Sequence, residues 1–176
     1  VSIENIGMIF GNGSSYATGI YNQSGGVIGK INNFGKIVGV LASESRGIYN
    51  TETITDIKNT GIIYGNGNTG FGIKSNGGVI KNLKNSGIIV GIGNNGEGHG
   101  ISNYNNYYEG PMEKLENTGK IMGISVNGFG YGLAVFNPGS EPINPIDNLG
   151  MIIGKGGSSG KGFVSESVNG DNINNF

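Results

Sequence analysis

The stretch that decides the fold is "IKNTGIIYG", Ile57 to Gly65, in which alternate positions hold Ile, Asn, Gly, Ile and Gly. A period of two residues indicates a β-strand whose side chains alternate between two faces. The other copies are "IENIGMIFG" from Ile3, "INNFGKIVG" from Ile31, "LKNSGIIVG" from Leu83, "LENTGKIMG" from Leu115 and "IDNLGMIIG" from Ile146. The pattern therefore predicts equivalent strands in which the Ile two places after the Gly of each copy points inward: Ile9, Ile37, Ile63, Ile89, Ile121 and Ile152.

The spacing of these copies predicts how the strands are connected. The Asn of the pattern stands at positions 5, 33, 59, 85, 117, 148 and 175, so the repeat is 26 to 32 residues long. Each repeat also holds a short apolar segment such as "GIYN" from Gly19, and an apolar residue such as Ile28 three places before the next copy. A helical solenoid is excluded, because each Gly inside a helix costs about 1 kcal/mol relative to Ala. Three strands per repeat predict a right-handed parallel β-helix of about six coils, with equivalent strands about 4.8 Å apart.

The columns of Asn and Gly have a physical interpretation in such a coil. Asn tolerates left-handed backbone angles, and Gly reaches them without steric cost, so Asn-x-Gly is predicted to form the corner between two strands. Stacked Asn side chains are also expected to hydrogen-bond to one another along the axis.

Composition limits the class of protein. The chain has 176 residues, of which 37 are Gly and only 13% are charged, yet its apolar residues recur at fixed places, which favours an ordered repeat. We interpret residues 1–176 as a single β-helical segment of a longer array, because the chain begins just before one copy and ends within another. A net charge of −1 without a basic run disfavours nucleic acid, and no apolar run is long enough for membrane insertion. The absence of Cys excludes disulfides, and we expect no cofactor.

The sequence offers weak candidates for catalysis. Two GxGxxG matches begin at Gly65 and Gly91, but no helix follows to receive a phosphate. The single histidine, His99, belongs to a column of mixed residues that we interpret as outward-facing and solvated. Outward positions on neighbouring coils are also shared by Asp56, Asn82 and Lys114. These three residues leave a carbohydrate-active β-helix as an alternative, although we expect no enzymatic activity.

Two surfaces are candidates for binding. The insertions Asn103–Pro111 and Asn137–Pro145 fall at the same corner of two coils and are expected to protrude. The candidate contact residues of the first insertion are Asn103, Tyr104, Tyr107, Tyr108 and Glu109. The second candidate is an outward apolar stripe formed by Phe10, Val38, Tyr64, Val90, Met122 and Ile153. Such a stripe indicates a contact surface, a face covered by another segment, or the apolar filling that a flat sheet prefers.

The copies "NTGIIYG", "NSGIIVG" and "NTGKIMG", with "GIYN" between copies, resemble the passenger domains of Gram-negative type V autotransporters. The similarity is greatest to large fusobacterial adhesins rich in Asn and Ile and to the β-helical part of vacuolating-cytotoxin-like proteins. This resemblance implies export across the outer membrane, followed by display on the cell surface or secretion.

It also implies a non-enzymatic adhesin segment, a rigid scaffold that presents loops to a protein or glycan of a host cell or another bacterium. A carbohydrate-active β-helix remains open, as does a vacuolating-type toxin fragment that assembles with like chains. End-to-end self-association through strand edges also remains open.

Overall fold

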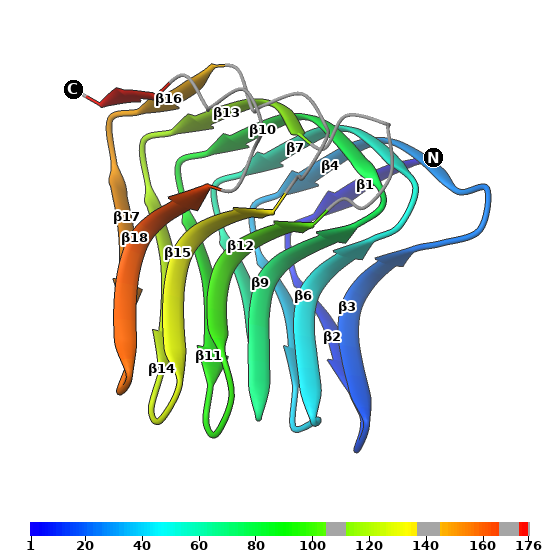
Figure 1. Cartoon of the computed structure of the whole chain (residues 1–176). Coiled ribbons are helices and arrows are strands. Elements are labelled where there is room, and N and C mark those ends of the chain that lie inside the picture. Colours follow the sequence, from blue (N-terminus) through cyan, green and yellow to red (C-terminus); the bar gives the residue numbers. More distant parts are fainter. Residues whose placement is uncertain (105–111, 137–144, 166–172, 176) are drawn as a thin grey trace.

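The computed structural model describes residues 1–104, 112–136, 145–165 and 173–175. The chain winds through three parallel sheets, visiting each once per coil, and the coils are stacked side by side (Figure 1). The predicted parallel β-helix with three strands per coil is therefore confirmed.

The strands fall into three groups that recur in the same order. Sheet A consists of β1 (Ser2–Asn5), β4 (Val27–Asn33), β7 (Thr53–Asn59), β10 (Val79–Asn85), β13 (Met112–Asn117), β16 (Ile146–Asn148) and β19 (Ile173–Asn175). Sheet B consists of β2 (Met8–Asn12), β5 (Lys36–Val40), β8 (Ile62–Gly67), β11 (Ile88–Gly93), β14 (Lys120–Ser125) and β17 (Met151–Lys155). Sheet C consists of β3 (Tyr16–Asn22), β6 (Glu44–Asn50), β9 (Thr69–Asn76), β12 (Gly98–Tyr104), β15 (Phe129–Phe136) and β18 (Ser159–Ser165).

The core is a set of apolar columns that run along the coil axis. Pairing between coils places Ile37 beside Ile63, and Ile63 beside Ile89, so equivalent residues of sheet B stack on one another. These three side chains are fully buried, as the alternation predicted. The equivalent residues of the first and last coils, Ile9 and Ile152, are only partly buried. Each inner coil therefore depends on the coils on both sides of it to exclude water from its Ile side chains.

A continuous hydrogen-bonded column of Asn side chains lies at the corner between sheets A and B. Asn33 donates to Oδ1 of Asn59 at 2.7 Å, and Asn59 donates in turn to Oδ1 of Asn85 at 2.8 Å. The same contact joins Asn5 to Asn33, Asn85 to Asn117 and Asn117 to Asn148. The predicted Asn column is confirmed.

The predicted reason for Gly at this corner is wrong. Among the described residues, the positive φ angles belong to Ser24, Gly25, Leu41 and Gly77, and none falls in an Asn-x-Gly corner. A Cβ on Gly35 would instead stand 2.0 Å from the carbonyl oxygen of the equivalent Gly one coil earlier. Glycine is required there because the backbones of successive coils approach closely, and not because the chain adopts a left-handed conformation.

Close approach also explains the Gly that ends each copy. A Cβ on Gly65 in β8 would lie 2.0 Å from the carbonyl oxygen of Phe71 in β9. Sheets B and C therefore meet backbone to backbone at this level, close to the tight turns that connect their strands (Figure 1). Between the two sheets at this level only small residues fit, such as the buried Ala17 and Ser45 and the equivalent Gly70, so the larger side chains of the neighbouring column point outward.

Candidate functional site

The outer face of sheet C carries two neighbouring columns of side chains, set by the pairing between coils. The first column contains Thr18, Arg46, Phe71, His99, Tyr131 and Lys161. The second contains Tyr21, Tyr49, Lys74, Ser102, Ala134 and Val164. In the second column the large Lys74 of the third coil is followed by the small Ser102 of the fourth coil, and this decrease in size leaves a hollow.

That hollow, which we call the sheet C groove, has a volume of about 370 Å³. Its lining residues are Phe71, Lys74, Asn76, Glu97, His99, Ser102 and Tyr104. The exposed and half-buried members, Asn76, Glu97, Tyr104 and Lys74, form its rim and walls, while Ser102 is only 5% exposed. The groove combines hydrogen-bonding groups with aromatic rings at a size within the range of about 300–1,000 Å³ that is usual for small-molecule sites.

His99 is buried in this groove, so the prediction of a solvated side chain is wrong. Its ring stacks on Phe71 with centroids 4.8 Å apart and lies 5.0 Å from the ring of Tyr131 on the next coil. Only 2% of His99 is exposed, because its neighbours in the same column cover both faces of the imidazole. The position of His99 in the repeat correctly predicted that its ring points away from the Ile core. That rings of the neighbouring coils cover it became clear only from the three-dimensional structure.

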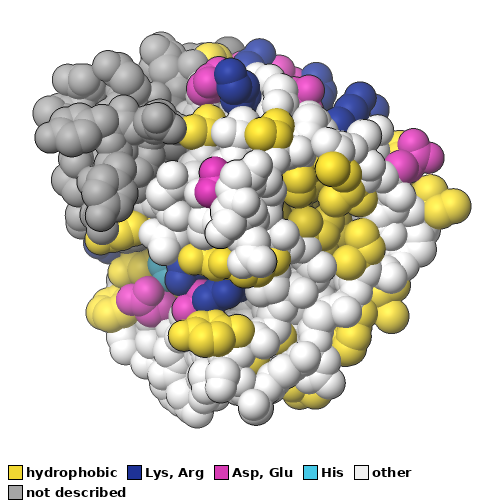
Figure 2. Space-filling view, turned by 90° about the vertical axis from the view of Figure 1, so that its right-hand side faces the viewer, with side chains coloured by type: hydrophobic (Ala, Val, Ile, Leu, Met, Phe, Trp, Pro, Cys, Tyr) yellow, Lys and Arg dark blue, Asp and Glu magenta, His cyan; other side chains and the backbone are white. Residues whose placement is uncertain are grey.

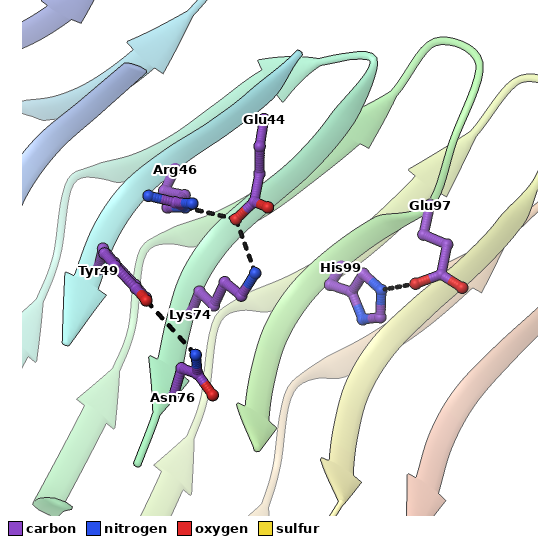
Figure 3. A network of polar contacts seen from close by, with 7 residues as sticks. All are labelled: Glu44, Arg46, Tyr49, Lys74, Asn76, Glu97 and His99. Atoms are coloured by element: carbon purple, nitrogen blue, oxygen red, sulfur yellow. Dashed lines mark hydrogen bonds and ion pairs between the residues drawn. The ribbon is translucent and has the colours of Figure 1, made fainter. Parts of the chain in front are cut away.

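One nitrogen of His99 is held by a carboxylate. Nε2 lies 2.9 Å from Oε2 of Glu97, and this hydrogen bond lowers the pKa of the Glu97 carboxyl group from its ordinary value. Nδ1 is buried and has no hydrogen-bond partner among the described residues. The contact holds the Glu97 carboxylate at the edge of the groove, where its remaining lone pairs can accept hydrogen bonds (Figure 3).

A second charged cluster orients the lysine of the groove. Glu44 accepts hydrogen bonds from Nε of Arg46 and, at 2.7 Å, from Nζ of Lys74 (Figure 3). Burial alone would raise the pKa of Glu44, but these two cations more than offset it and the pKa is lowered. The guanidinium of Arg46 also lies over the ring of Tyr49, 4.1 Å from the centroid. The three charges are therefore fixed relative to one another and to an aromatic ring.

The groove continues toward the first coils as a second hollow of about 520 Å³. Its lining residues are Tyr16, Thr18, Tyr21, Arg46 and Tyr49. Nδ2 of Asn76, on the rim of the groove, lies 3.5 Å from the hydroxyl of Tyr49, which joins the two hollows. Basic, acidic and hydrophobic side chains are gathered together on the left-hand side of Figure 2. This part of sheet C is aromatic and polar, and beside the two hollows the carboxylates of Glu44 and Glu97 balance the cations of Arg46 and Lys74.

The residues expected in the first insertion have different positions. Asn103 and Tyr104 belong to β12, and Asn103 is fully buried, in the column that contains Asn22, Asn50 and Ser75. The expected exposed position of Asn103 is therefore wrong, whereas Tyr104 is 38% exposed and lines the groove. The other candidates, Tyr107, Tyr108 and Glu109, lie outside the described residues, as does most of the second insertion.

The apolar stripe lies on the outer face of sheet B, but it is not uniformly exposed. Pairing between coils aligns Phe10, Val38, Tyr64, Val90, Met122 and Ile153, as predicted. Phe10 is 52% exposed and Val90 only 7%, while the other four are half-buried. Val90 is therefore not part of an exposed surface, and the exposed apolar stripe is interrupted at this residue.

The outward column on which the alternative of a carbohydrate-active enzyme depends lies on sheet A. Asn82 pairs with Asp56 on one side and Lys114 on the other, and it donates a hydrogen bond of 2.9 Å to Asp56. The nearby Glu116 lies in β13 and bonds to Lys114 and Lys84, which lower the pKa of its carboxyl group. A carboxyl group with a lowered pKa is ionised at neutral pH and is a poor general acid for glycoside cleavage.

Comparison of the chain with protein-family models, with curated proteins and with solved structures gives no match. Among the described residues, no group of three or more His, Cys, Asp or Glu side chains is arranged to hold a metal ion. No helix in the described ranges is long and apolar enough to cross a membrane. The candidate site is therefore assigned from its own geometry.

Proposed function

We propose that this chain is a rigid segment of a surface-displayed adhesin, of the kind found in type V autotransporter passenger domains, and that it binds partners through side chains on its outer faces. The observation that carries the proposal is the combination of a regular scaffold with a preformed polar and aromatic groove on one face. The resemblance of the repeat sequence to such passenger domains supports the cellular setting. In this setting the protein is exported and exposed to host cells or to other bacteria.

The scaffold has the properties that such a role requires. Equivalent strands pair residue by residue along the three sheets, and buried Asn side chains connect successive coils. A stack of this kind is extended along one axis and resists bending, because every coil is bonded to its neighbours along three sheets. Binding side chains on its faces are consequently held at fixed spacing.

We further propose that the segment acts by binding rather than by catalysis. The imidazole of His99 is covered by Phe71 and Tyr131 and is hydrogen-bonded to Glu97, so it is poorly placed to accept a proton from a substrate. On sheet A, the Lys contacts of Glu116 favour an ionised carboxylate. Both features support a structural role for these groups.

Binding to cells tests the proposal. The purified, fluorescently labelled chain should bind epithelial or bacterial cells in a saturable manner, and unlabelled chain should compete for the same sites. Heat-unfolded chain is the control, because it has the same composition without the scaffold. A variant with residues 105–111 replaced by a two-residue turn shows whether the first insertion contributes. Binding no greater than that of the unfolded control would contradict an adhesive role and leave the segment as a spacer.

A further inference from the structure

The chemistry of the sheet C groove indicates the class of ligand that it accepts. We propose that the groove binds a short, neutral oligosaccharide, an inference that rests on the proposed adhesive function and specifies its ligand. The groove offers a half-buried ammonium on Lys74, an amide on Asn76, a carboxylate on Glu97 and a hydroxyl on Ser102. Hydroxyl groups of a sugar both donate and accept hydrogen bonds, so they suit a mixture of donors and acceptors of this kind.

The same groove provides apolar surface for the carbon skeleton of a sugar ring. Tyr104 is an exposed part of its lining, and the stacked, largely buried rings of Phe71 and His99 line the same groove. A pyranose has faces rich in C–H groups between its hydroxyls, and these pack against aromatic carbon atoms while the hydroxyls bond to polar side chains. An aromatic wall beside an amide and a carboxylate therefore matches the two kinds of surface on a sugar.

The charge of the groove favours a neutral sugar over an acidic one. Lys74 is the only Lys or Arg among the described residues that line it, and this ammonium is already bonded to the carboxylate of Glu44. Glu97 adds a negative charge at the rim, with 48% of its side chain exposed. A sialylated or sulfated sugar would place its anion beside Glu97 without an unpaired cation to receive it, which is unfavourable.

The strands beneath the groove disfavour an extended peptide. β9 and β12 are paired on both sides, with β6 and β15 as their outer neighbours, so their backbone groups are already hydrogen-bonded within sheet C. A peptide would find no free strand edge here, and its own N–H and C=O groups would have to bond to side chains alone. A sugar has no such requirement for backbone pairing.

The polar groups are held in position before a ligand arrives. Lys74 is fixed by Glu44 and lies over the ring of Phe71 at 4.5 Å, while Glu97 is fixed by His99. Side chains that are already ordered lose little conformational entropy on binding, so a small ligand can be held by few contacts.

A filled groove gives a direct test. Ser102→Tyr should fill the floor without disturbing the sheet, because Tyr21 and Tyr49 already occupy the same column in earlier coils. Ser86→Tyr is the matched control, since it makes the same change at an exposed position in the corner between sheets A and B, where the equivalent residue of an earlier coil, Phe34, is already an exposed aromatic. Thermal melts of both variants first establish that they fold like the wild-type chain.

The probe is an array of neutral, sialylated and sulfated di- to tetrasaccharides, screened with the full 176-residue chain and both variants. We expect neutral sugars to bind the wild-type chain, and at least tenfold weaker binding after Ser102→Tyr with no change after Ser86→Tyr. No binding to the array, binding only to anionic sugars, or equal binding by the filled variant would overturn the inference. If Ser102→Tyr fails to fold, Asn76→Ala takes its place, because this exposed amide lines the groove without supporting the core.

The cell-binding assay separates this inference from the adhesive function. Saturable binding of the wild-type chain to cells without any sugar on the array refutes the sugar groove but retains the adhesin. Binding to a neutral sugar without binding to cells retains the sugar groove but contradicts the adhesive function. Binding in both assays that is lost together on filling the groove supports both proposals.

Discussion

Removal of one amide from the buried Asn column, by Asn59→Ala, should destabilise the protein far more than removal of an Asn from the surface. Asn59 is fully buried; its Oδ1 accepts from Asn33 at 2.7 Å and its Nδ2 donates to Asn85 at 2.8 Å. The substitution interrupts the column at its centre, and Ala cannot replace either contact.

The magnitude follows mainly from the two side-chain groups of the column that lose a partner; the carbonyl oxygens of Gly61 and Ile88 also lose longer contacts with Nδ2 of Asn59, of 3.3 and 3.2 Å. Nδ2 of Asn33 retains its contact with the carbonyl oxygen of Ile62 at 3.1 Å but loses its other acceptor, and Oδ1 of Asn85 loses its donor. A buried polar group without a partner costs about 1–3 kcal/mol, so the free energy of unfolding should fall by about 2–6 kcal/mol. At about 2–4 °C per kcal/mol for a chain of this size, Tm should fall by about 4–24 °C.

The assay is thermal unfolding followed by circular dichroism, with Asn94→Ala as the matched control. Asn94 also donates a hydrogen bond to an Asn of a neighbouring coil, Asn66, at 3.1 Å, but this contact is exposed. Its loss should change stability by no more than about 0.5 kcal/mol. Equal changes in Tm for the two variants would refute the reasoning, since they differ chiefly in burial.

Three other substitutions test the fold and its charged cluster. Ile89→Ala should cost about 2–5 kcal/mol on chemical denaturation, because this side chain is fully buried between coils, and a cost below about 1 kcal/mol would argue against the Ile columns. Gly35→Ala should prevent native folding, whereas Gly7→Ala should not, because a Cβ meets a carbonyl oxygen at 2.0 Å in the first case and nothing within 4 Å in the second; similar melting curves would contradict the close approach of coils. Glu44→Gln should destabilise the protein at neutral pH by removing the charge that Arg46 and Lys74 bind. Because the folded pKa of Glu44 is lowered, its stabilisation is present above its ordinary value of 4.5 and is lost as the pH falls through the folded pKa, so the Tm difference between wild type and variant should shrink below pH 4.5; a constant difference from pH 7 to pH 3 would exclude this ionisation as the cause.

Much of the scaffold could be predicted because its rules repeat along the chain. Alternation within a strand assigned Ile63 to the core, and the fixed spacing of Asn59 and Asn85 aligned their amides. Both inferences use short-range geometry and the requirement that equivalent strands pair. The Asn and Ser that end the "GIYN"-type segments were available as a signal for the second polar column, which contains Asn50 and Asn103, but their burial was not inferred from it.

The candidate site was predicted much less well. Of the residues that line the sheet C groove, only Tyr104 was expected to contact a partner, and His99 was expected to be solvated. Column membership identifies a side chain as outward-facing, but it does not show how neighbouring rings cover it. The contact between Glu44 and Lys74, 30 residues apart, likewise depends on how the strands of sheet C lie beside one another.

The sequence by itself determined the repeat length, the three strands of each coil, the inward Ile and the Asn column, because these follow from periodicity and from parallel pairing of equivalent strands. Only the tertiary structure decided where sheets B and C touch, and therefore why Gly65 has no room for a side chain. It also decided that Ser102, following Tyr49 and Lys74 in its column, leaves a groove beside buried His99. The physical reason is that burial and hollows arise from the volumes of side chains on adjoining coils and sheets, which no single repeat contains.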